Sequence, residues 1–181
     1  MRQLRGTELK RLHRTWRRRS ADRLALLLDN VGNPYNVGSI VRTAAALGVD
    51  DLYLAGQSAS PRSPKAQKTA LGTDRYLDFT EHATVAQAAD AARADGYFVV
   101  GVELADPATP LAELELARDV CLVFGHEDHG ISHAGLAACD ALAYIPLVGK
   151  VGSLNVASAA AIACYEVRRQ HWAATAGTEA D

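Results

Sequence analysis

Short apolar runs that alternate with helix-like segments constrain the fold of this chain most. The first run, Leu24–Asp29, places five apolar residues before an aspartate, and such uninterrupted runs are typical of buried parallel strands. This alternation predicts an α/β domain in which helices cover both faces of a parallel sheet. Further strands are predicted at 51–55, 76–79, 97–102, 120–124 and 141–145, and helices at 7–19, 37–47, 65–71, 85–94, 131–138 and 155–171.

Length and composition narrow the class of protein. The 181 residues, of which 49% are hydrophobic, suffice for one domain with a core. No apolar run approaches the roughly 18 residues that a membrane span requires, and the arginine-rich start lacks the apolar region of a secretory signal. A mitochondrial presequence is a weaker alternative, which Glu8 and Asp22 disfavour. Three cysteines without Cys-x-x-Cys spacing indicate reduced thiols, not a zinc site. We therefore predict a cytoplasmic protein with no membrane segment and no metal.

Basic residues concentrate at the beginning of the chain. Residues 1–23 contain nine Arg and Lys and two acidic residues, so the remainder holds ten basic and 19 acidic residues. Leu9, Leu12 and Trp16 form one stripe of the first predicted helix, with arginines around its other faces. We predict that residues 1–22 form a basic arm that contacts the phosphate backbone of a nucleic acid; a solvated helix without a ligand is the alternative. The contacting side chains would be Arg11, Arg14, Arg17, Arg18 and Arg19.

Polar loops follow three of the predicted strands. The first loop leads into a helix, with Asn36 at its start and Arg42 six residues later. The second places Glu127 and two histidines between glycines, and the third ends at Ser153 and Asn155. Because ligands of open α/β sheets bind beyond the carboxyl ends of the strands, these loops predict one shared site.

Each of these residues also has a purely structural interpretation. Asn36, Ser153 and Asn155 could each cap a helix, and Arg42 could be an exposed helix residue in an ion pair. The two histidines are too weak a signal for a metal. The chain has no Gly-x-Gly-x-x-Gly after its first strand, no Gly-x-x-x-x-Gly-Lys-Ser/Thr and no Gly-x-Ser-x-Gly. A dinucleotide-binding fold, a P-loop and a nucleophile elbow are therefore disfavoured.

Together, the three loops resemble the motifs of the SpoU/TrmH family of RNA methyltransferases, in the SPOUT superfamily. The resemblance covers about residues 24–169, and the motifs occur in the family's order. Asn-x-Gly-x-x-x-Arg falls on Asn36, Gly38 and Arg42, Gly-x-Glu-x-x-Gly on Gly125, Glu127 and Gly130, and Ile-Pro with Ser-Leu-Asn-Val on Ile145, Pro146 and residues 153–156.

The resemblance implies a fold and contacts that composition and spacing alone do not give. The C-terminal third of the family is tied into a trefoil knot, and active sites lie at a dimer interface, so we expect a knot and a homodimer with the last helix near its interface. The knot loops bind S-adenosylmethionine, here through Leu104, Gly125, Ile145 and Leu154. The family's catalytic polar set falls on Asn36, Arg42, Glu127, Ser153 and Asn155.

The implied reaction is methylation of a ribose 2′-hydroxyl in structured RNA. We expect transfer RNA as the substrate; ribosomal RNA and an RNA-binding protein without activity are alternatives, and a nucleotide-dependent oxidoreductase is the weakest. Free arginine has a pKa of about 12.5–13.8 and stays protonated. We therefore interpret Arg42 as a cation that clamps a phosphate and stabilises the developing alkoxide, not as the base. The chain then divides into the arm (1–22), a methyltransferase domain (23–172) and a flexible tail (173–181).

Overall fold

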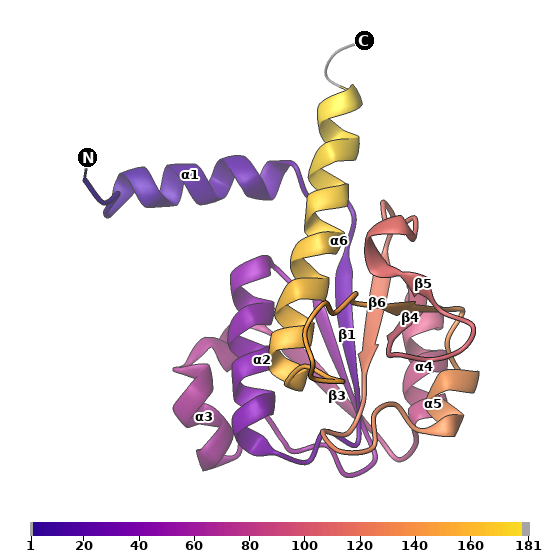
Figure 1. Cartoon of the computed structure of the whole chain (residues 1–181). Helices are drawn as coiled ribbons and strands as arrows, with labels where there is room; N and C mark the ends of the chain where they lie inside the picture. The colour runs from indigo at the N-terminus through magenta and orange to yellow at the C-terminus, as the bar shows by residue number, and fades with distance from the viewer. Residues whose placement is uncertain (1, 179–181) are drawn as a thin grey trace.

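The computed structural model describes residues 2–178 and shows one parallel sheet between two layers of helices (Figure 1). The sheet order is β3-β2-β1-β6-β4-β7-β5, and every strand pairing within it is parallel. This confirms the predicted α/β fold. Its strands are β1 (Leu24–Asp29), β2 (Asp51–Ala55), β3 (Asp78–His82), β4 (Phe98–Val102), β5 (Thr109–Pro110), β6 (Val120–Phe124) and β7 (Ala141–Tyr144).

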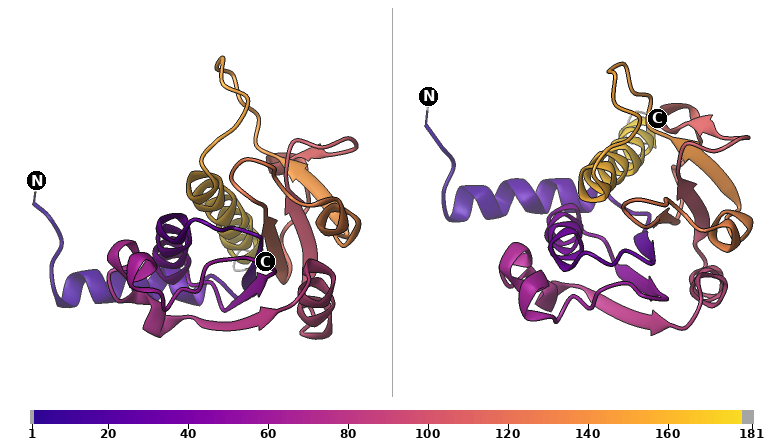
Figure 2. Two further views of the ribbon diagram at one scale, coloured as in Figure 1. Left: turned by 90° about the horizontal axis from the view of Figure 1, so that it is seen from below. Right: turned by 60° about the horizontal axis from the view of Figure 1, so that its bottom comes forward.

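Helices pack on both faces of the sheet, as the sequence predicts (Figure 2). Leu26 and Leu28 of β1 point into an apolar cluster with α2 and α6, while Ala25 and Leu27 point into a second cluster with α4. Alternate side chains of one strand therefore fill two cores, which explains the uninterrupted apolar run. The helices are α1 (Thr7–Arg18), α2 (Pro34–Leu47), α3 (Pro64–Ala70), α4 (Val85–Ala94), α5 (His133–Ala137) and α6 (Val156–Thr178), with 3₁₀ turns η1 (Thr73–Tyr76) and η2 (Leu111–Glu113).

Helix α2 begins three residues earlier than predicted, and this changes the role of Asn36. The side chain of Asn33 accepts a hydrogen bond from the Tyr35 N–H at 3.0 Å, and Pro34 occupies the first helical position. Proline suits that position because its missing N–H would have no partner there. The cap is therefore Asn33, and the interpretation of Asn36 as a helix cap is wrong.

Strand β3 also differs from its prediction at 76–79. Residues 73–76 form the 3₁₀ turn η1, and the strand pairs with β2 from Asp78 to His82. It lies at the edge of the sheet, and none of its side chains is fully buried. An edge strand with mostly polar, exposed side chains has no clear run of apolar residues. The prediction from apolar residues therefore placed this strand two residues too early.

Helix α6 continues to Thr178, whereas a tail was expected from residue 173. Contacts with the end of the arm hold this extension: the Trp172 indole N–H donates to the Ser20 hydroxyl at 2.8 Å, and the Thr175 hydroxyl donates to the Arg19 carbonyl at 3.0 Å. Residues 173–178 are thus helical, and 179–181 lie outside the described residues.

The basic arm forms a helix that stands away from the sheet (Figure 1). No residue of α1 is buried, and its arginines up to Arg18 are exposed. Its base is fixed where the Trp16 and Trp172 rings meet, with centroids 4.8 Å apart, and the Arg19 guanidinium lies 5.1 Å from the Trp16 ring. Within residues 2–178, no helix combines the length and hydropathy that crossing a membrane demands.

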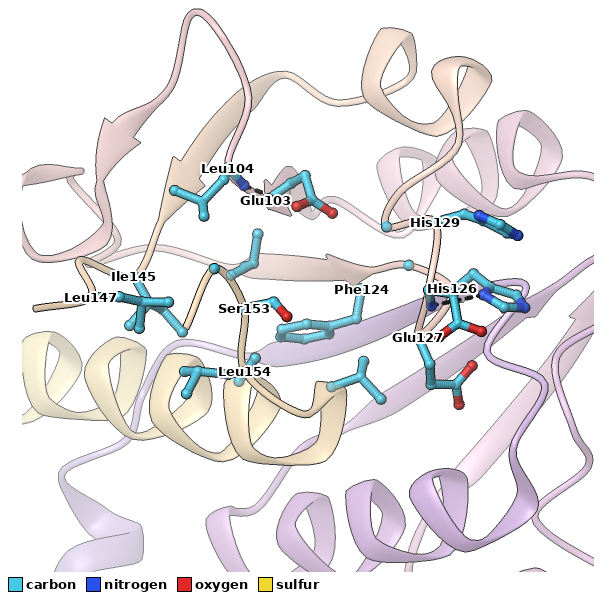
Figure 3. A pocket seen from close by; sticks show the side chains of 17 residues that line it. Glu103, Leu104, Phe124, His126, Glu127, His129, Ile145, Leu147, Ser153 and Leu154 are labelled. Atoms are coloured by element: carbon cyan, nitrogen blue, oxygen red, sulfur yellow. Dashed lines mark hydrogen bonds between the residues drawn. The ribbon is translucent and has the colours of Figure 1, made fainter. Parts of the chain in front are cut away.

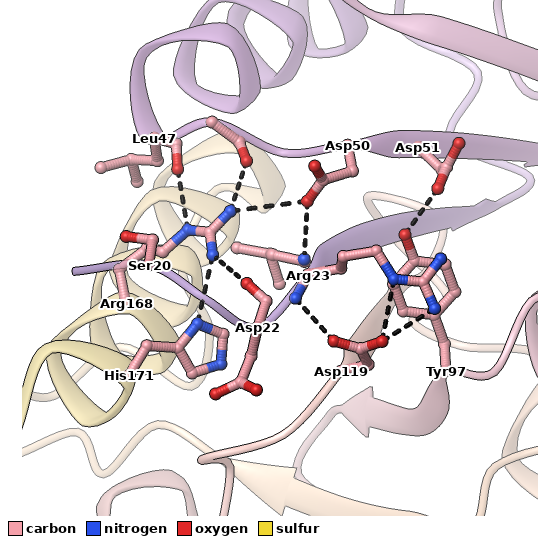
Figure 4. A network of polar contacts seen from close by, with 12 residues as sticks. Ser20, Asp22, Arg23, Leu47, Asp50, Asp51, Tyr97, Asp119, Arg168 and His171 are labelled. Carbon is pink, nitrogen blue, oxygen red and sulfur yellow. Dashed lines mark hydrogen bonds and ion pairs between the residues drawn. The ribbon is translucent and has the colours of Figure 1, made fainter. Parts of the chain in front are cut away.

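Two buried polar side chains of α6 tie together segments at the amino ends of the strands (Figure 4). Arg168 donates to the Leu47 carbonyl at 2.9 Å and to Nδ1 of His171 at 3.1 Å. Because arginine can only donate, Nδ1 is the acceptor, and Nε2 donates to the carbonyls of Leu116 and Arg118 at 3.0 and 3.1 Å. His171 is therefore neutral; burial first, and Arg168 second, lower its pKa.

Candidate functional site

A pocket of about 340 Å³ opens at the carboxyl ends of β4, β6 and β7, where the polar loops meet (Figure 3). This volume lies in the range of small-molecule sites. All four predicted cofactor contacts line it: Leu104, Gly125, Ile145 and Leu154. The other lining residues are Val102, Glu103, Phe124, His126, Glu127, Asp128, His129, Gly130, Leu147, Gly152, Ser153, Val156 and Ala159.

A tight turn after β6 forms one wall of the pocket. The His126 N–H donates to the Gly130 carbonyl at 2.9 Å, and the Gly130 N–H returns a bond of 2.8 Å to the His126 carbonyl. A Cβ at Gly125 would lie 2.1 Å from backbone atoms of Gly130 and Ile131. The packing of this turn therefore requires glycine at position 125, whether or not a bound ligand requires it as well.

Glu103 holds this turn against the end of β4, and the sequence did not single it out. Its carboxylate accepts from the Ile131 N–H and from the Leu104 N–H, both at 3.0 Å. A Cβ at Gly130, whose φ is +68°, would lie 2.3 Å from the Glu103 Oε2 atom. An acidic residue directly after a predicted apolar strand was the signal that could have revealed it.

Three of the five predicted catalytic residues form one hydrogen-bonded network. Asn36 donates to Glu127 Oε1 at 2.9 Å, and Asn155 donates to Asn36 Oδ1 at 3.0 Å. The Asn33 N–H adds a bond of 3.1 Å to Glu127 Oε1. Asn155 also caps α6, since its Oδ1 accepts from the Ala157 N–H at 2.9 Å. The network therefore fixes the three polar loops relative to one another.

Glu127 is a carboxylate in this network. Burial acts to raise its pKa, but hydrogen bonds from Asn36 and from backbone N–H groups outweigh burial, so the pKa of Glu127 lies below its ordinary value. A carboxylate that accepts from the Asn36 amide fixes which way that amide points. Its Oδ1 is then the atom that faces Asn155.

The structure does not bring Arg42 and Ser153 into this network. Ser153 lines the pocket without a side-chain hydrogen bond in the described part of the chain. Arg42 is exposed on α2, with no hydrogen bond or ion pair to any residue in 2–178. Arg42 lies one helical turn after Gly38. A Cβ at Gly38 would approach both the Ala66 carbonyl oxygen and Thr69 Oγ1 to 2.1 Å. The motif-one glycine thus lets α3 pack directly on α2, while the arginine remains available to a ligand.

Carboxylates dominate the charge of the pocket. Glu103, Glu127 and Asp128 line it, and no Lys or Arg of the described chain does. The remaining walls are apolar side chains and backbone. Such a lining suits a ligand that carries positive charge and an apolar ring better than a polyphosphate. The rings of His126 and His129 stack at the rim, with their centroids 4.8 Å apart. Within residues 2–178, no group of three His, Cys, Asp or Glu side chains could hold a metal.

Known proteins resemble this chain in sequence and in fold. The model of the SpoU rRNA Methylase family matches residues 23–165. A 23S rRNA (guanosine-2′-O-)-methyltransferase, RlmB, of Acinetobacter baylyi is 34% identical over 81% of this chain and 60% of its own length. A tRNA (guanosine(18)-2′-O)-methyltransferase of Escherichia coli is 32% identical over 84% of this chain and 66% of its own length.

Solved structures agree with the sequence comparisons. The SpoU methyltransferase AviRb of Streptomyces viridochromogenes, in complex with the cofactor AdoMet, superposes with a TM-score of 0.74 at 32% identity, over 82% of this chain and 58% of that one. The TrmH/SpoU tRNA modifying enzyme of A. aeolicus gives a TM-score of 0.74 at 27% identity, over 90% of this chain and 83% of that one. The chain spans about 60% to 66% of the length of the two relatives compared by sequence. By its family match and its relatives, this chain belongs to the SpoU rRNA Methylase family.

Proposed function

We propose that the protein is an S-adenosylmethionine-dependent methyltransferase that acts on a ribose 2′-hydroxyl in RNA. The observation that carries this proposal is the hydrogen-bonded network of Asn36, Glu127 and Asn155 beside an acidic pocket at the carboxyl edge of the sheet. Relatives named for this reaction act on transfer RNA and on ribosomal RNA. Transfer RNA is the proposed substrate and ribosomal RNA the alternative; the exposed arginines of α1 suit the phosphate backbone of a folded RNA.

The lining residues fit S-adenosylmethionine. Leu104, Ile145 and Leu154 provide apolar walls for an adenine ring, and the carboxylates suit a net positive charge. When bound, the cofactor would supply an electrophilic methyl group on its sulfonium sulfur. Leu104, Gly125, Ile145 and Leu154 are therefore the proposed cofactor contacts.

The remaining site residues would position the ribose and its charge. The network of Asn36, Glu127 and Asn155 would hold the 2′-oxygen in line with the methyl group, and alignment of this kind accounts for much of catalysis. Arg42 would approach a phosphate or the 2′-oxygen as a cation and stabilise the negative charge that develops there. Ser153, with its hydroxyl free in the described chain, would donate or accept one further bond to the substrate.

The knot, the homodimer and the cytoplasmic location complete the proposal. A knot is supported by β7, which lies between the earlier strands β4 and β5, and by residues 145–155, which return from it to α6. A dimer that buries α6 is supported by exposed Ile162 and Tyr165, which lie on one stripe of that helix with exposed fractions of 45% and 56%. The RNA substrates of the relatives support a cytoplasmic location.

Ligand binding tests the cofactor assignment. We expect calorimetry to show binding of S-adenosylmethionine and S-adenosylhomocysteine, and neither NAD nor ATP, because the acidic lining repels phosphates. Asn36→Ala removes a hydrogen bond to a carboxylate, of about 1.5–3 kcal/mol, and should slow methyl transfer about 10- to 150-fold while S-adenosylhomocysteine still binds. Tight NAD binding without S-adenosylhomocysteine binding would contradict the proposal.

Salt dependence tests the arm. Replacing Arg11, Arg14, Arg17 and Arg18 with glutamine keeps Trp16 and Arg19, which anchor the helix. If all four side chains contact phosphates, the slope of log affinity for RNA against log salt falls by about 3, at about 0.7–0.9 per contact. An unchanged slope would show that α1 is a solvated helix without a role in binding.

A further inference from the structure

A second cavity, of about 560 Å³, adjoins the proposed cofactor pocket. The two share His126, Glu127 and Asp128, so the same short loop is a wall of both. Figure 3 shows His126 and Glu127 at the end of the first pocket opposite Ile145 and Leu147, which is the end that faces the second cavity. A ligand in the second cavity would therefore lie against Glu127 and Asn33, whose N–H donates to the Glu127 carboxylate.

The far side of this cavity is formed by Pro34 and Tyr35 of α2 and by Lys65 of α3. Residues 61–73 contain three Arg and Lys and no acidic residue, in contrast to the acidic body of the chain. Lys65 lines the cavity, and neither it nor Lys68 forms an ion pair within residues 2–178. Arg93 and Arg169, by comparison, are paired with carboxylates. The cation available to a phosphate in this cavity is therefore Lys65.

Tyr35 offers an aromatic ring on an anchored backbone in the same cavity. Its backbone N–H donates to the Asn33 side chain, and its carbonyl accepts from the hydroxyls of Ser39 and Thr69 at 2.9 and 3.0 Å. The residue is 46% exposed, and within residues 2–178 its hydroxyl has no hydrogen bond and its ring stacks on no other aromatic ring. An exposed aromatic ring of this kind is what single-stranded nucleic-acid sites use to stack a base.

Charge sets the direction in which a nucleotide would enter. Glu127 and Asp128 lie on the wall shared with the cofactor pocket, whereas Lys65 comes from α3. A phosphate would be attracted to Lys65 and repelled by the shared wall. The sugar would then be the part nearest Glu127, whose carboxylate is hydrogen-bonded to Asn36.

We propose that this cavity receives the nucleotide that is methylated, with its base stacked on Tyr35 and its phosphate on Lys65. The inference rests on the proposed function, because it assigns the substrate side of that same site. It adds Tyr35 and Lys65 as substrate-binding residues, neither of which is one of the polar residues named for the three motifs. The substrate class is a nucleotide unstacked from its RNA.

The test uses protein saturated with S-adenosylhomocysteine, titrated with the four nucleosides and their 5′-monophosphates and followed by NMR. We expect the amide signals of Tyr35 and Lys65 to shift, and the monophosphates to bind more tightly than the nucleosides. Lys65→Gln should remove that preference and leave nucleoside binding unchanged. Lys68→Gln, on the same helix but outside the cavity, is the matched control and should keep the preference.

Single-turnover methylation of total tRNA gives the second readout. Tyr35→Ala should lower the rate at subsaturating RNA about 5- to 150-fold, the loss of one stacked base, and Tyr35→Phe should restore it. Tyr76→Ala, at a tyrosine that is 64% exposed and lines neither cavity, should have no effect.

The outcomes separate this inference from the proposed function. If S-adenosylhomocysteine does not bind, the proposed function fails. If it binds and RNA is methylated, but millimolar nucleotides leave Tyr35 and Lys65 unshifted or Tyr35→Ala methylates RNA at the wild-type rate, then the cavity is not the nucleotide site and this inference alone is overturned.

Discussion

Gly125→Ala is the substitution whose effect follows most directly from the structure. The new methyl carbon would lie 2.1 Å from the backbone of Gly130 and Ile131, whereas ordinary contact begins at 3.4 Å, so the turn must retreat by about 1.3 Å. Backbone atoms cannot move aside as a flexible side chain does. The two hydrogen bonds between His126 and Gly130 would break, and the turn would leave the pocket wall.

The size of the effect can be worked from these contacts. Two backbone hydrogen bonds contribute about 1 kcal/mol each, and overpacking adds about 1–3 kcal/mol, so the turn is destabilised by about 3 kcal/mol or more. Affinity for S-adenosylhomocysteine should fall about 100-fold, at about 1.4 kcal/mol per factor of ten. If the whole domain bears the strain, Tm should fall by about 6–12 °C.

Calorimetry and thermal unfolding check both numbers. The matched control is Gly149→Ala, because a Cβ at Gly149 has no heavy atom within 4 Å; it should bind and unfold as the wild type does. A Gly125→Ala protein with wild-type affinity and Tm would refute the claim that the turn packs directly on Gly125.

Three further predictions concern charge. Glu103→Gln removes a charge from the pocket and one of the two oxygens that accept backbone N–H bonds. The lost acceptor affects S-adenosylmethionine and S-adenosylhomocysteine alike, so the ratio of their affinities isolates the charge. That ratio should fall about three- to tenfold if the two charges are about 6 Å apart at an effective dielectric constant of about 40–80; an unchanged ratio in calorimetry would exclude this role. Because the pKa of His171 is lowered on folding, the unfolded state binds more protons below about 6.5, so the free energy of unfolding should decline as pH falls below that value; a flat denaturant-unfolding profile from pH 7.5 to 5.5 would contradict the neutral assignment. Arg42→Lys keeps the charge but loses the planar fork, so methyl transfer should stay slow at every pH in single-turnover assays, whereas recovery at high pH would indicate a base.

The positions of strands and helices were predicted best where their apolar side chains are fully buried. Strands β1 and β6 and helix α4 were located to the residue, because apolar side chains on both faces of a strand or along one face of a helix leave an unambiguous pattern. The edge strand β3 was misplaced because hydrophobicity does not mark it. The start of α2 was misjudged between two asparagines, although Pro34 between them was a usable signal for the first helical position.

The candidate site was predicted through its motifs, and the parts outside them were missed. Glu103 stabilises the pocket from a strand end that no motif includes. At the opposite edge of the sheet, outside the site, the sequence also missed Arg168 and His171. They bind backbone carbonyls at 47 and at 116–118, partners too distant in sequence for any local pattern. The network of Asn36, Glu127 and Asn155 also depends on topology, because β1 and β6 must be neighbours before their loops can meet.

The central claim is that a methyl group is transferred to a ribose oxygen, and the position of the label tests it most directly. The protein is incubated with S-adenosylmethionine labelled in its methyl group and with separate transfer RNA and ribosomal RNA, and the RNA is then hydrolysed with alkali. A 2′-O-methyl group blocks cleavage of the adjacent phosphodiester, so the account predicts label in alkali-resistant dinucleotides, with transfer RNA the better substrate. Label in mononucleotides, which would indicate a methylated base, or no label from a protein that binds the cofactor, would contradict it.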